Sequence, residues 1–120
     1  MPVRILVIED DSDVRALMLE ALSREGHIVE DASDGVEGLQ MAREHRPDVI
    51  LLDLMMPTMD GWAFLDEQKR DPRIADVPVV LVSGCPEEKV EDLEADAYLH
   101  KPYDLGELLA LVSRWTGIDA

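Results

Sequence analysis

Acidic side chains follow two of the apolar runs of this chain. Glu9, Asp10 and Asp11 come directly after one run, and Asp53 ends another. Carboxylates that are held close together repel one another and need a cation or a bound proton. Their oxygen atoms suit Mg²⁺, which keeps several waters and completes its coordination with phosphate oxygens. If the fold brings the two runs together, these residues favour phosphoryl transfer to a carboxylate.

Two further residues of suitable type follow later apolar runs. Ser83 carries a hydroxyl and Lys101 an ammonium, and both groups can hold phosphoryl oxygens. Each residue alone has a simpler interpretation, since serines begin turns and lysines are usually solvated. Asp11 is expected to cap the next helix or to interact with its dipole. The phosphoryl interpretation therefore depends on all of these residues meeting at one edge of a sheet.

Short apolar runs alternate with amphipathic segments along the chain, and the pattern predicts five strands and five helices. Strands are expected at residues 3–8, 28–29, 49–53, 78–83 and 97–100. The first helix is expected between an N-cap at Ser12 and a stop at Gly26. Three more are expected at residues 35–44, 62–69 and 87–93. The last helix is expected after Asp104, which forms a capping box with Glu107. Core positions of the first and last helices are Val14, Leu17, Met18, Ala21, Leu22, Leu105, Leu108, Leu109, Val112 and Trp115. This alternation predicts an α/β fold in which helices cover both faces of a parallel sheet, with ligands at the carboxyl ends of the strands.

Size and charge exclude several classes of protein. The 120 residues, of which 47% are hydrophobic, suit one domain over residues 1–120. The apolar runs are far shorter than the roughly 20 residues of a spanning helix, and no secretory signal opens the chain. A single cysteine, Cys85, favours the cytoplasm. With 27 acidic and 11 basic residues, a net charge of −16 and no basic patch, the chain is not expected to bind nucleic acid.

Histidines and tryptophans offer weaker candidates. His27, His45 and His100 show no metal-ligand spacing and are expected at the surface. Trp62 and Trp115 are expected to pack on their own helices. None of these residues changes the phosphoryl interpretation.

Four segments resemble CheY-like response regulator receiver domains. They are residues 5–11, 46–61, 79–84 and 98–102, and the stretch from Asp53 to Gly61 is the most specific. The resemblance covers nearly the whole chain. It implies a doubly wound, flavodoxin-like fold with a five-stranded parallel sheet in the order 2-1-3-4-5.

The resemblance implies a role for each acidic residue of the site. Asp53 matches the phosphoacceptor, and Asp10 matches the carboxylate that binds Mg²⁺ directly. Glu9 matches the acid that binds the ion through water. The backbone carbonyl of Met55 matches the remaining protein ligand, beside Asp53 itself.

The same resemblance implies residues that respond to the phosphoryl group. Lys101 would contact the phosphoryl oxygens, directed into the site by a cis peptide bond before Pro102. Ser83 would be the switch hydroxyl that moves toward the phosphoryl group, and Tyr98 the aromatic switch that rotates into the vacated space. The surface of helix four, strand five and helix five would then change.

The implied function is that of a receiver in a His-to-Asp phosphorelay. Asp53 would attack the phosphorus of a phosphohistidine on a sensor histidine kinase or phosphotransfer protein, with Mg²⁺ neutralising charge. The protein would catalyse only its own phosphorylation and dephosphorylation, so it is not expected to be an enzyme. Its output would be contact with a downstream protein target.

Two features differ from the family pattern. The segment from Ser83 to Lys101 is about one helical turn short, so helix four is expected to be short, and Glu94 replaces the usual glycine. The chain stops at Ala120, which favours a stand-alone regulator over a receiver fragment of a larger response regulator or hybrid kinase.

Two alternative classes remain. An aspartate-nucleophile phosphatase uses similar chemistry, but it typically carries Asp-x-Asp after its first strand, where this chain has Glu9, Asp10 and Asp11. Its substrate-binding cap also barely fits within 120 residues. A receiver-like module that is never phosphorylated stays open, although the complete acceptor set argues against it.

Overall fold

The computed structural model describes residues 3–53, 61–83, 96–100 and 103–116. Its strands are β1 (Arg4–Ile8), β2 (Ile28–Ala32), β3 (Val49–Asp53), β4 (Val79–Ser83) and β5 (Ala97–His100). Its helices are α1 (Ser12–Arg24), α2 (Gly35–Glu44), α3 (Gly61–Arg70) and α5 (Leu105–Thr116). The predicted short helix at residues 87–93 lies outside the described residues. Every other predicted element is present, and β2 is longer than the pattern indicated.

All strand pairs are parallel, and the sheet has the order β2-β1-β3-β4-β5. This order confirms the predicted topology. β1 and β3 are direct neighbours, with Ile8 level with Leu52. The residues that follow Ile8 therefore leave the sheet beside Asp53.

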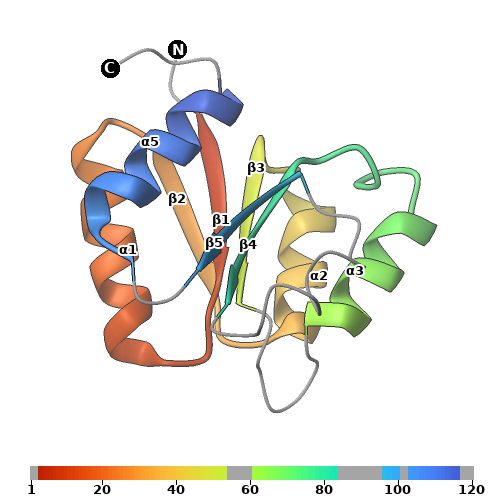
Figure 1. The fold of residues 1–120 in the computed structure, drawn as a ribbon. Coiled ribbons are helices and arrows are strands. Elements are labelled where there is room, and N and C mark those ends of the chain that lie inside the picture. The colour runs from red at the N-terminus through yellow and green to blue at the C-terminus, as the bar shows by residue number, and fades with distance from the viewer. Residues whose placement is uncertain (1–2, 54–60, 84–95, 101–102, 117–120) are drawn as a thin grey trace.

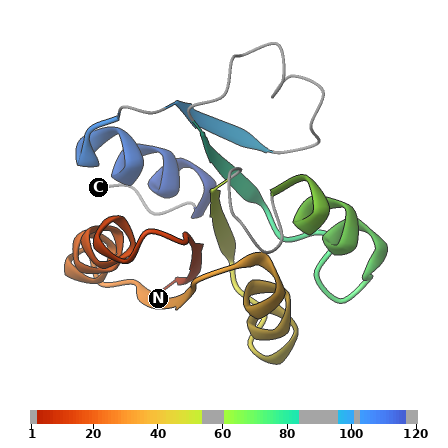
Figure 2. The same cartoon turned by 90° about the horizontal axis from the view of Figure 1, so that it is seen from below.

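Helices cover both faces of the sheet, as Figures 1 and 2 show: α1 and α5 lie on one side, α2 and α3 on the other. Alternate residues of β3 point to the two faces: Ile50 and Leu52 join the core cluster that includes Phe64 of α3, whereas Val49 and Leu51 join the cluster on the opposite face. All five residues of β3 are buried. Burial on both faces therefore fixes the position of Asp53, the residue at the carboxyl end of this strand.

The helix caps follow the sequence pattern with one correction. Asp11, not Ser12, is the N-cap of α1: its side chain accepts hydrogen bonds from two backbone N–H groups of the first turn, at 2.9 and 3.1 Å. The capping role predicted for Asp11 is therefore confirmed, and the one predicted for Ser12 is wrong. Gly26 ends the helical segment with φ +88°, a conformation that favours glycine. Asp104 caps α5 by accepting from the backbone N–H three residues later, at 2.8 Å.

Three burial predictions are wrong. Leu17 is 57% exposed, because α1 places Met18 and Leu22 against the sheet and leaves Leu17 at the edge of its apolar stripe. Leu105 is 42% exposed at the first position of α5, one turn before Leu108 reaches the core. His27 is only 8% exposed, since it lies where the chain re-enters the sheet between α1 and β2.

Other predictions for individual side chains are confirmed. His45 is exposed, and its Nδ1 lies 3.2 Å from Glu30, so the predicted surface position holds. Trp62 packs against the core cluster on the α2 and α3 face. The side chains of His100 and Trp115 are outside the described residues.

Within the described ranges, no helix is both long and apolar enough to cross a membrane.

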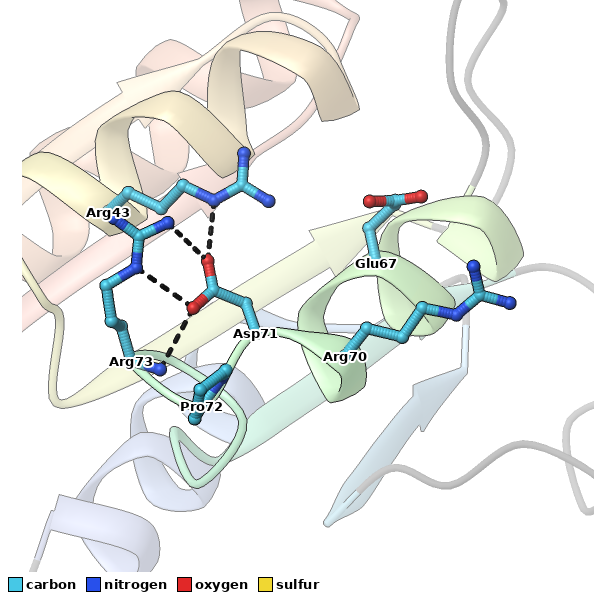
Figure 3. A pocket seen from close by; sticks show the side chains of 6 residues that line it. All are labelled: Arg43, Glu67, Arg70, Asp71, Pro72 and Arg73. Carbon is cyan, nitrogen blue, oxygen red and sulfur yellow. Dashed lines mark hydrogen bonds and ion pairs between the residues drawn. The ribbon is translucent and has the colours of Figure 1, made fainter.

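A buried carboxylate connects α2 with the loop after α3. Asp71 is 8% exposed and accepts hydrogen bonds from Arg73 Nε (3.0 Å), Arg73 Nη2 (2.8 Å), the Arg73 backbone N–H (2.9 Å) and Arg43 Nε (2.8 Å) (Figure 3). These residues help to line a surface pocket of about 430 Å³. The Arg73 side chain first, and then Arg43, hold the pKa of Asp71 far below its ordinary value.

Asp71→Asn is expected to lower the free energy of unfolding at pH 7, and this loss should shrink in acid. Because the folded pKa of Asp71 lies below its unfolded value, the carboxylate stabilises the fold above about pH 4 and loses its contribution as pH falls through the folded pKa. Urea unfolding of both proteins at pH 7, 5 and 3 measures the difference.

Asp66→Asn provides the control for this prediction. The Asp66–Arg70 pair, at 3.2 Å, is largely exposed, so its loss should change stability little at any of the three pH values. A deficit in Asp71→Asn that stayed constant from pH 7 to pH 3 would contradict the prediction.

Candidate functional site

Glu9, Asp10 and Asp53 come together at the carboxyl ends of β1 and β3. One carboxylate oxygen from each residue lies within 4.8 Å of the other two. Glu9 and Asp53 are buried, at 2% and 5% exposure, whereas Asp10 is exposed. The predicted convergence of these three carboxylates is therefore observed. Asp11 is not part of the cluster, because its side chain caps α1.

Hydrogen bonds on three sides hold Glu9 in place. Its backbone N–H donates to the carbonyl of Ala32 at the end of β2, at 3.1 Å. Its carbonyl accepts from Arg15 Nη1 at 2.7 Å, and its Oε2 accepts from the backbone N–H of Asp11 at 3.2 Å. The backbone between β1 and α1 is thus held by contacts to α1 and β2.

Arg15 is the residue of this region that the sequence pattern missed. Its side chain is 19% exposed, and its Nε donates to Asp31 Oδ2 on β2 at 2.9 Å. The sequence offers one signal, a basic residue one helical turn after the acidic run. Nothing in the spacing shows that this residue contacts the Glu9 carbonyl.

The chemistry of the three carboxylates fits a hard divalent cation. At separations near 5 Å and an effective dielectric constant of about 20, each pair of ionised carboxylates repels by roughly 3 kcal/mol. A cation between them adds an attraction to each carboxylate, and these attractions outweigh the repulsion. The donor set of the cluster consists of carboxylate oxygens, which suit Mg²⁺ better than Zn²⁺ or Cu²⁺. Glu9, Asp10 and Asp53 could therefore hold Mg²⁺.

Two other predicted site residues lie on neighbouring strands. Ser83 ends β4, which pairs with β3 so that Asp53 is level with Val82. Tyr98 is half-buried on β5 and packs against the core cluster on the α2 and α3 face. The side chain of Ser83 is outside the described residues, so its distance from Asp53 stays untested.

Three predicted residues lie wholly outside the described residues. They are Met55, Lys101 and Pro102. The carbonyl ligand, the phosphate-contacting lysine and the cis peptide bond therefore stay predictions.

Comparison with known families agrees with this site. The model of the response regulator receiver domain family matches residues 5–113, a range that contains all three carboxylates of the cluster. A receiver domain is a phosphoacceptor module of two-component signalling with a histidine kinase as partner, rather than an enzyme that acts on a separate substrate.

Curated relatives include proteins about twice as long. The chain is 41% identical over 113 residues to the DNA-binding dual master transcriptional regulator RpaA of Synechocystis sp., covering 91% of this chain and 47% of that protein. It is 42% identical over 112 residues to the response regulator MprA of Mycobacterium sp. strain KMS, covering 92% and 49%. The chain thus spans about half the length of these curated relatives.

Solved structures share the fold over almost the entire chain. The receiver domain of the sensor histidine kinase PA1611 from Pseudomonas aeruginosa PAO1 has a TM-score of 0.89 at 25% identity, covers 98% of this chain and 99% of that one, and has a magnesium ion in its active site cleft. The chemotaxis protein CheY4 of Vibrio cholerae has a TM-score of 0.87 at 29% identity, covering 95% and 98%. From its sheet order, its acidic cluster and the family match, the chain belongs to the CheY-like response regulator receiver domains.

Proposed function

We propose that this protein accepts a phosphoryl group on Asp53, in a Mg²⁺-dependent reaction, from a sensor histidine kinase or phosphotransfer protein. The observation that carries the proposal is the cluster of Glu9, Asp10 and Asp53 at the ends of two adjacent central strands. Asp53 is the acceptor in this proposal because it is the last residue of the fully buried strand β3, which holds its carboxylate in one place.

Asp10, Asp53 and the carbonyl of Met55 would hold Mg²⁺ directly, and Glu9 through water. When bound, the ion supplies positive charge that offsets the charge of the carboxylates and of the transferring group. An oxygen of Asp53 attacks the phosphorus of the phosphohistidine. The new P–O bond forms as the P–N bond breaks, and the histidine ring leaves with that electron pair. Lys101 would pair with the phosphoryl oxygens of the acyl phosphate.

The signal is proposed to cross the sheet from β3 toward β5. Ser83 ends β4, the neighbour of β3, and Tyr98 lies on β5, the neighbour of β4. Movement of the Ser83 hydroxyl toward the phosphoryl group would free space for Tyr98 to rotate, so a chemical event becomes a packing change. The altered surface would bind a downstream protein, and the net charge of −16 supports a protein target over direct contact with DNA. The proposal concerns this domain, whether it works alone or beside an effector domain as in a longer regulator.

The experiment that tests the proposal is incubation with Mg²⁺ and acetyl phosphate, a small phosphoryl donor, followed by intact mass spectrometry. A gain of roughly 80 Da is expected for one phosphoryl group. A parallel incubation with excess EDTA should show no gain. Absence of a gain with Mg²⁺, or an equal gain with EDTA, would contradict the proposal.

A further inference from the structure

One guanidinium connects three parts of the molecule next to the acidic cluster. Arg15 on α1 donates from Nη1 to the carbonyl of Glu9, at 2.7 Å, and from Nε to Asp31 Oδ2 on β2, at 2.9 Å. The side chain is only 19% exposed, so both contacts are partly shielded from water. The residue that follows β1 is thereby tied to α1 and, through Asp31, to β2.

The Glu9 carbonyl belongs to the peptide unit that joins Glu9 to Asp10. The orientation of this unit sets the directions in which the two side chains leave the backbone. The Glu9 N–H is already bonded to Ala32, at 3.1 Å, so the Arg15 contact fixes the other side of the same residue. Rotation of this peptide unit would move the carboxylates of Glu9 and Asp10 relative to Asp53.

We propose that Arg15 is a positioning residue for the metal site. By holding the Glu9 carbonyl, it keeps the carboxylates of Glu9 and Asp10 directed toward Asp53, while Asp31 holds the guanidinium in place. This inference rests on the proposed function, because it assumes that the cluster binds Mg²⁺. Groups that orient metal ligands in this way contribute about 10- to 100-fold to metal affinity.

Charge alone predicts the opposite effect. A guanidinium beside a cation site repels the cation, so removal of Arg15 without positioning should tighten Mg²⁺ binding. Replacing Arg15 alone would also leave the charge of Asp31 uncompensated. The double variant Arg15→Met/Asp31→Asn removes one charge of each sign, so the net charge stays at −16. The two charges form one ion pair, so their effects on the cluster largely offset each other, and a tenfold loss of affinity then reports on geometry.

The test compares this double variant with a matched control. Arg24→Met/Glu20→Gln removes an exposed ion pair from the same helix, at 2.6 Å and 77% and 59% side-chain exposure, without touching the cluster. Mg²⁺ is titrated into each metal-free protein and followed by the backbone amide signals near the cluster. We expect about tenfold weaker binding in Arg15→Met/Asp31→Asn and a change of less than about twofold in the control.

The conservative variant Arg15→Lys adds a rescue measurement. Its ammonium keeps the charge and can reach one of the two acceptors, but it lacks the planar fork that reaches both. We expect an affinity between those of the wild type and the double variant. Unfolding in EDTA is measured in parallel, because lost packing lowers stability without changing the Mg²⁺ affinity of the folded protein.

The outcomes separate the two proposals. If the wild-type protein shows no Mg²⁺-dependent amide shifts, the proposed function fails. If it binds Mg²⁺ and Arg15→Met/Asp31→Asn binds as tightly or more tightly, the positioning role of Arg15 is overturned and the proposed function stands.

Discussion

Asp53→Asn is expected to abolish phosphorylation by acetyl phosphate, so that the roughly 80 Da mass gain of the wild type disappears. The amide has nearly the shape of the carboxylate, but its oxygen is neutral and far less nucleophilic than the carboxylate oxygen that must bond to phosphorus. Asp53 is 5% exposed at the end of β3, and asparagine fills the same space, so the fold should be kept. Intact mass spectrometry measures the labelling, and circular dichroism checks the fold.

Asp11→Asn is the matched control for this prediction. Asp11 is an acid next to the cluster in sequence, but it caps α1, and asparagine is an equally good N-cap. Labelling of Asp11→Asn should therefore match that of the wild type. Persistent labelling of Asp53→Asn would move the acceptor to Asp10 or Asp11.

Asp10→Asn is expected to change metal binding and stability in opposite directions. Loss of a direct carboxylate ligand should weaken Mg²⁺ binding by more than about tenfold. In EDTA, the variant should be more stable than the wild type by roughly 0.5–1 kcal/mol, because one of three neighbouring negative charges is gone and solvent screens the exposed Asp10. Saturating Mg²⁺ should stabilise the wild type more than the variant, by about 1.4 kcal/mol for a tenfold difference in affinity, so the order of the two proteins should reverse.

Urea unfolding with EDTA and with Mg²⁺ measures this reversal. Asp76→Asn removes the same charge from an exposed position outside the cluster, and it should change neither Mg²⁺ affinity nor the response of stability to the ion. The same order of wild type and Asp10→Asn in both buffers would show that Asp10 is not a ligand.

Most of the fold could be predicted because its signals are local. The runs that became β1 and β3 are apolar except for one end residue each, as is typical of strands buried on both faces, and amphipathic segments with helical spacing follow them. The order of these strands in the sheet cannot be predicted from local sequence patterns. That Glu9 and Asp10 stand beside Asp53 depends on the pairing of β1 with β3, and the strand order came from the family resemblance.

The remaining features depend on contacts between segments that are distant in sequence. Arg15 meets Asp31 sixteen residues away, and Arg43 meets Asp71 twenty-eight residues away, so no local pattern identifies either partner. Gln68 looks like a surface glutamine, yet it is fully buried and its amide donates to two backbone carbonyls at 2.9 and 3.0 Å. Helical periodicity likewise predicted that Leu17 is buried, but this side chain is exposed. Periodicity locates the apolar stripe of a helix and does not show how much of that stripe the sheet covers.

The pairing of β1 with β3 also has a kinetic consequence. Between these strands in the sequence lie α1, β2 and α2, so their parallel pairing must close a long loop before it gains contacts. Glu9 and Asp53 meet only when that closure is complete. The ability to bind Mg²⁺ should therefore return during refolding together with the native sheet and not earlier. Neither a fragment that ends before β3 nor one that begins with α1 would contain all three carboxylates, so metal binding reports that the chain has reached its correct topology.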